Sequence, residues 1–138
     1  HNVFPALNDS LQKWSQTNMK TINYSRKGEE CLTEMYSAIS AEIPLPTDPV
    51  NFKADLYKGC VDTEKLVVCG QALSHCVNFT VRDIHARVVE TGDLQASDMY
   101  LLADASSPVP GFEANGTQFI EDMRSAGMNI TTSVEFTP

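Results

Sequence analysis

Apolar residues recur at helical spacing in the first third of the chain and alternate with polar residues in most of the remainder. Leu7, Leu11 and Trp14 are spaced to share one face of a helix, which residues 8–10 would cap at its start. A second helix is predicted over residues 29–39, where apolar residues again fall on one face. The N-terminal part of the chain is therefore predicted to be helical.

The alternating part of the sequence predicts strands. Three prolines within residues 43–49 end the helical region, because proline fixes φ and lacks a backbone donor. The longest strand signal covers residues 76–89, where the parity of the apolar positions switches at Arg82-Asp83 and predicts a β-bulge. Shorter strands are predicted at residues 52–56, 66–69 and 99–103.

The end of the chain predicts a short helix and a closing strand. Residues 119–126 have helical spacing, and Gly127 would terminate that helix. Residues 128–136 alternate between apolar and polar and form a half-buried last strand. The predicted fold class is α+β, with N-terminal helices packed on an antiparallel β-sheet and a short helix before the last strand. The alternative is an all-β sandwich with a helical N-terminal extension.

Length and charge limit the possible partners. The 138 residues, 1–138, are the size of a single domain. The net charge of −8 would repel a phosphate backbone, so nucleic acid and anionic membranes are excluded as main partners. No apolar run reaches the roughly 20 residues that span a bilayer, so no membrane insertion is expected.

Five tripeptides match the N-glycosylation acceptor pattern. Their asparagines are Asn8, Asn23, Asn78, Asn115 and Asn129. Together with an even number of cysteines, they point to a secreted glycoprotein in an oxidising compartment. On the predicted strands, Asn78 and Asn129 would face solvent, where a glycan is tolerated.

The four cysteines are predicted to form two disulfides. A hairpin turning at residues 64–65 would place Cys60 opposite Cys69, which leaves Cys31 to pair with Cys76. The other pairings stay open, because Glu-Lys is a poor two-residue turn. Zinc is disfavoured, since the spacings lack the short paired-ligand pattern of a zinc site.

Other side chains are candidates for chemical sites. An N-terminal histidine such as His1 binds copper when a second histidine lies beside it, and His75 and His85 are the candidates. Asp83 and His85, with Ser74 or Ser25 nearby, would have the composition of a hydrolase triad. No G-x-S-x-G motif accompanies them, so a solvent-exposed pair is the favoured interpretation.

These observations predict a non-enzymatic secreted glycoprotein module. It would serve a structural or recognition role in an extracellular coat, matrix or filament, with itself or another extracellular protein as partner. No cofactor or catalytic residue is expected. One alternative is a small-molecule carrier with a pocket between helices and sheet. The less favoured alternative is a copper-dependent oxidase using His1.

Overall fold

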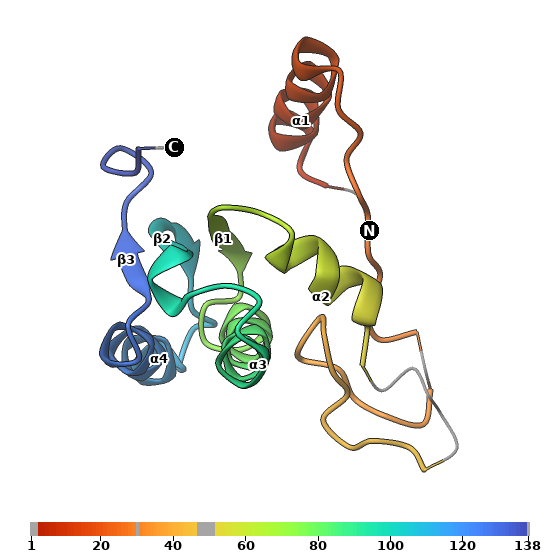
Figure 1. The fold of residues 1–138 in the computed structure, drawn as a ribbon, viewed down its shortest axis with the longest axis vertical. Coiled ribbons are helices and arrows are strands. Elements are labelled where there is room, and N and C mark those ends of the chain that lie inside the picture. Colours follow the sequence, from red (N-terminus) through yellow and green to blue (C-terminus); the bar gives the residue numbers. More distant parts are fainter. Residues whose placement is uncertain (1–2, 30, 47–51, 138) are drawn as a thin grey trace.

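The computed structural model describes residues 3–29, 31–46 and 52–137 (Figure 1). In chain order the elements are α1 (Pro5–Asn18), α2 (Ala54–Val61), β1 (Leu66–Gln71), α3 (Cys76–Thr91), the 3-10 helix η2 (Ala96–Asp98), β2 (Met99–Ser107), α4 (Glu113–Ser125) and β3 (Asn129–Thr131). From β1 onward strands and α-helices alternate, which is the order that produces a parallel sheet.

The sheet is parallel, with β2 between β1 and β3. Leu66 pairs with Met99 and Tyr100 pairs with Asn129. The antiparallel α+β prediction is therefore wrong, and so is the alternative all-β sandwich. Since α3 and α4 carry the chain back to the starting edge after each strand, every strand runs in the same direction.

The largest error concerns residues 76–89, which were predicted to be a strand and form most of α3. Val77, Val81, Ile84 and Val88 are buried along this helix. Their spacing of four, three and four residues is that of one helical face. The parity switch at residues 82–83 was thus the signature of a 3.6-residue period and not of a β-bulge.

Two shorter predictions also fail. The described part of residues 29–39 contains no helix, because the Ser37 hydroxyl accepts the N–H groups of Ile39 and Ser40 in a local turn. The strand predicted at 52–56 gives way to α2, leaving Phe52 in an isolated antiparallel bridge with Ser40. In contrast, the predictions of an N-terminal helix, of two of the strands and of a helix near the end of the chain are confirmed by α1, β1, β2 and α4.

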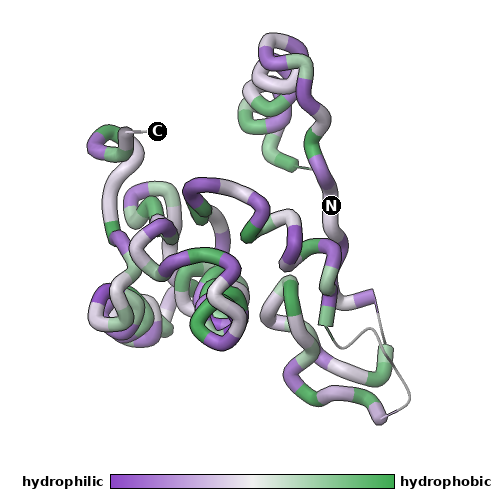
Figure 2. Tube along the Cα trace, in the orientation of Figure 1, coloured by the Kyte–Doolittle hydropathy of each residue, from purple (hydrophilic) through white to green (hydrophobic). Residues whose placement is uncertain are grey.

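The N-terminal helix begins differently from the prediction. Proline occupies its first position, at Pro5, and the preceding Phe4 makes no side-chain cap. Helix α1 stands apart from the sheet and has no buried residue (Figure 1). Leu7 and Trp14 of this helix are exposed to solvent, and Figure 2 shows hydrophobic positions along it.

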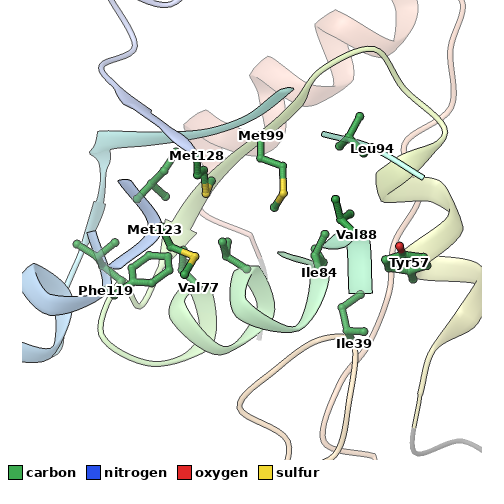
Figure 3. Close-up of a cluster of buried hydrophobic side chains, with 13 residues drawn as sticks. Ile39, Tyr57, Val77, Ile84, Val88, Leu94, Met99, Phe119, Met123 and Met128 are labelled. Carbon is green, nitrogen blue, oxygen red and sulfur yellow. The ribbon is translucent and has the colours of Figure 1, made fainter. Parts of the chain in front are cut away.

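The core lies between the sheet and the pair α3 and α4, which cover one face of it (Figures 1 and 3). Met99 and Leu101 of β2 point into this layer and are fully buried, as is Phe119 of α4. The opposite sheet face is less covered, with Val67 exposed and Tyr100 packed edge-on against Phe136. In the described residues no helix is long and apolar enough to cross a membrane.

The closing strand is shorter than predicted. The prediction covered residues 128–136, whereas β3 contains Asn129–Thr131. After β3 the chain turns away, and the Asp104 carboxylate accepts the backbone N–H and the hydroxyl of Ser133. These two hydrogen bonds hold the pKa of Asp104 below its usual value. This acidic residue thus anchors the segment that follows the sheet.

Candidate functional site

A pocket of about 210 Å³ lies where β1 ends and α3 begins. We call it the β1–α3 pocket. It combines residues of β1, of the first turns of α3, and of the loop before α2. They are Lys27, Ala38, Val68, Cys69, Gln71, Cys76, Val77 and Thr80. The carboxyl end of a parallel strand is the usual position for a site in α/β folds.

The connection between β1 and α3 is fixed by backbone hydrogen bonds. The Ala72 carbonyl accepts the N–H groups of His75 and Val77, and Leu73 donates to the Ser107 carbonyl of β2. The peptide bond that links Gln71 to Ala72 is cis. Leu73 is buried under this connection. Cys76, the first residue of α3, is therefore held in place at the edge of the pocket.

A cation lies in the same pocket as the Cys76 thiol. The Lys27 ammonium donates a hydrogen bond of 2.8 Å to the Met35 carbonyl, which fixes the end of this flexible side chain. Both Lys27 and Cys76 line the β1–α3 pocket. The N-terminus of a helix adds partial positive charge, so the pocket favours a negatively charged group.

Aromatic rings surround His75, the residue directly before Cys76. The Ser74 hydroxyl accepts the Val109 N–H and lies 2.8 Å from His75 Nδ1. The His75 ring lies 4.8 Å from the Phe112 ring and 5.7 Å from the Tyr36 ring, between centroids. The rings of Tyr36 and Phe112 are both 44% exposed, so this aromatic cluster lies at the surface.

The predicted disulfides are not formed, because Cys60, Cys69 and Cys76 carry free thiols. The Cys60–Cys69 prediction assumed a hairpin, whereas Cys60 lies on helix α2. The Cys31–Cys76 prediction assumed that Cys76 lies within a strand, whereas it begins a helix. Cys60, Cys69 and Cys76 are therefore available as nucleophiles, which two disulfides would have excluded.

A second thiol lies by a larger hollow of about 450 Å³, formed by residues 23–25 and α2. Cys60 lines it, and burial raises the pKa of the Cys60 thiol, which favours the protonated form. None of the described residues lining this hollow is a lysine or an arginine. The β1–α3 pocket is therefore the better candidate for thiol chemistry.

The hydrolase triad considered from the sequence is not assembled, and the copper site considered for His1 lies outside the described residues. His85 is ten positions beyond His75 along α3, about 15 Å on a helix, and its Nε2 lies 3.4 Å from the Ala126 carbonyl. Asp83, two positions before His85, points from a different side of the helix. Among the described residues, no three metal-binding side chains gather to hold an ion.

The sequons occupy different environments. Asn78 is buried in α3, where its side-chain oxygen accepts the Arg82 Nε–H at 2.6 Å. A glycan there would disrupt this contact. Asn23 and Asn115 are exposed, as is Asn129, and Asn8 is half-buried on α1. Use of these sequons, the single domain and the extracellular location stay predictions.

No family model and no curated protein matches the chain. Two solved structures share its fold. One is the yeast nicotinamidase Pnc1p, with a TM-score of 0.59, 18% identity, and 89% of this chain and 50% of that chain covered. The other is Pnc1p bound to the inhibitor nicotinaldehyde, with the same TM-score and identity, and 91% and 51% covered. The chain thus spans about half the length of these structures.

These neighbours overturn the functional prediction. They are enzymes with a parallel α/β fold, so the prediction of a non-enzymatic, self-assembling module is wrong. Neither the fold nor the free thiols support secretion or glycosylation. The residues that sequence reasoning missed are Cys76 and Lys27. A strand followed within a few residues by Ser74-His75-Cys76 was the available signal, whereas Lys27 carried none.

Proposed function

We propose that this protein is a hydrolase that uses Cys76 to cleave a small carboxamide. One observation carries the proposal: the thiol of Cys76, at the first position of a helix, shares a pocket with the Lys27 ammonium. A thiolate is the nucleophilic form of cysteine, and positive surroundings favour it. The fold neighbours support an amide substrate, since both are structures of a nicotinamidase.

The reaction follows from these two groups. The Cys76 sulfur attacks the carbonyl carbon, and negative charge develops on the carbonyl oxygen. The partial positive charge at the start of α3 and the Lys27 ammonium stabilise that charge. The C–N bond then breaks and the nitrogen leaves as ammonia with a proton from solvent, which replaces the proton that the Cys76 thiol released when it ionised. Water hydrolyses the resulting thioester, which gives the carboxylic acid and restores the thiol.

The aromatic rings around His75 support an aromatic substrate. Tyr36 and Phe112 flank His75, the residue directly before Cys76. Aromatic rings prefer offset or edge-on contacts with one another. A heteroaromatic amide would contact these rings with its own ring and present its carboxamide to Cys76. Nicotinamide is the substrate to test first, because the neighbours' names specify it.

Ammonia release from nicotinamide tests this proposal. We expect the wild-type protein to release ammonia and the Cys76→Ala variant to lose at least about 10³-fold in kcat/KM, since the nucleophile is removed. Cys60→Ala, which removes a thiol from a different hollow, is the matched control and should keep its activity. Undiminished turnover by Cys76→Ala would disprove the assignment.

A further inference from the structure

A second thiol lines the β1–α3 pocket together with Cys76. It belongs to Cys69, an exposed residue near the end of β1. Cys69 lies where the register of β1 against β2 shifts, between Val68 and Gly70. The regular ladder is interrupted there, so the backbone around Cys69 is less constrained than that of the preceding strand.

The local backbone allows the Cys69 side chain to move toward Cys76. Gly70 follows it with a φ of 126°, a conformation that side-chain-bearing residues rarely adopt. No atom lies within 4 Å of the position that a Cβ on Gly70 would take. The Cys69 side chain is exposed and lies outside the regular pairing of β1 with β2, so its reorientation toward Cys76 does not require the buried core to move.

We propose that Cys69 is a resolving thiol that forms a reversible disulfide with Cys76 when the protein meets hydrogen peroxide. The inference rests on the proposed function, because the nucleophilic thiolate is also the group that peroxide oxidises first. The observation that carries the inference is that Cys69 and Cys76 both line one pocket. Cys60 lines a separate hollow and takes no part.

The chemistry balances in two steps. The Cys76 thiolate attacks one peroxide oxygen, the O–O bond breaks, and hydroxide leaves as Cys76 becomes a sulfenic acid. The Cys69 sulfur then attacks the Cys76 sulfur, the S–O bond breaks, and the departing hydroxide takes the Cys69 proton as water. Two thiols and one peroxide thus give one disulfide and two waters. The disulfide blocks the pocket and prevents further oxidation of Cys76.

A single tryptic peptide reports the reaction. Cleavage after Lys65 and Arg82 releases residues 66–82, which contain Cys69 and Cys76 and no other cysteine. After peroxide treatment of the intact protein and alkylation of remaining thiols, this peptide should be about 2 Da lighter than its unalkylated form. Dithiothreitol should restore both thiols. Sulfinic acid on Cys76 without the mass loss, unmodified thiols, or a disulfide to another peptide would each overturn the inference.

Two variants sharpen the test. Cys69→Ser removes the resolving thiol, so peroxide should drive Cys76 to sulfinic acid, and the fraction of Cys76 thiol recovered on reduction should fall at least about tenfold. Cys60→Ser should behave like the wild type. Because the readout is a mass, it is independent of turnover: a disulfide without amide hydrolysis would leave the inference standing and refute the proposed activity. Amide hydrolysis without a disulfide would refute the inference and leave the proposed activity standing.

Discussion

The Thr80 hydroxyl accepts a hydrogen bond of 2.9 Å from the Ala38 N–H. This bond ties the loop before α2 to the first turns of α3. Lys27 is fixed to the same loop through the Met35 carbonyl, and Cys76 is one helical turn from Thr80. The two groups assigned to the chemistry therefore keep their relative position through a contact between residues that lie far apart in the sequence.

Thr80→Val should weaken the site without removing a catalytic group. Valine keeps the shape of threonine but cannot accept the Ala38 N–H, so we expect the free energy of unfolding to fall by about 1 kcal/mol. We also expect kcat/KM to fall by more than this change in stability alone would cause. Thr80→Ser retains the acceptor and should restore most of the activity. Amide hydrolysis and chemical denaturation of both variants measure this. Equal activity in the two variants would show that the bond does not position the loop.

Removing the charge of Lys27 should slow the reaction strongly. Lys27→Met keeps the length of the side chain and loses the ammonium, so we expect kcat/KM to fall about 10²-fold through poorer stabilisation of the developing oxyanion. Lys58→Met is the matched control, because Lys58 makes an exposed pair with Asp62 on α2. Comparable losses in both variants would mean that net charge, and not the position of Lys27, controls the rate.

Phe119 should be among the most costly residues to truncate. It is fully buried between α4 and the sheet, so Phe119→Ala should lower the free energy of unfolding by about 3–5 kcal/mol. Val89→Ala, on the exposed side of α3, should change it by no more than about 0.5 kcal/mol. Urea denaturation followed by circular dichroism compares the two. Similar small effects would contradict the placement of the core.

The ion pair between α3 and α4 should make stability depend on pH. Arg82 donates a hydrogen bond of 2.6 Å to Asp122, which with the bond from Gln118 lowers the pKa of Asp122. A lowered folded-state pKa stabilises the fold above the unfolded value of about 3.9, and this contribution is lost as pH falls through the folded value.

Asp122→Asn should therefore unfold at a lower temperature than the wild type at pH 7. The gap should narrow as pH falls below about 4 and vanish once the Asp122 carboxyl is protonated. Asp62→Asn, which affects a more exposed pair with Lys58, should show a smaller difference. Thermal melts from neutral to acid pH test this. A gap that stays constant with pH would show that the charge of Asp122 is not involved.

The sequence predicted the strands with continuous apolar runs better than the helices of mixed composition. Leu66 to Cys69 and Met99 to Ala103 were placed correctly, because each is a short apolar run of the length of a strand. The sequence of α3 is rich in valine and threonine, residues typical of strands, and this propensity misled the assignment. Burial of one face of this segment against the sheet favours the helix. A helix between β1 and β2 in turn makes these two strands parallel.

The site was harder to predict than the fold. Cys76 becomes a candidate once α3 is known to begin there. Strand β1 and a short connection then precede it, and the rest of the helix follows it. Lys27 reaches the pocket through a loop without regular structure, held by Thr80 and the buried Ile39. No periodic pattern encodes such a loop. The prediction that Asn78 faces solvent was wrong, because this residue is buried in α3 and accepts a hydrogen bond from Arg82.

The covalent role of Cys76 can be measured directly with nicotinaldehyde, the inhibitor bound in one of the neighbouring structures. An aldehyde labelled with carbon-13 at its carbonyl carbon shows by NMR whether a thiol has added to that carbon. We predict that the wild-type protein converts the aldehyde signal to that of a tetrahedral thiohemiacetal carbon, and that Cys76→Ala does not. An unchanged aldehyde signal with the wild type, or the same adduct in the variant, would contradict the account.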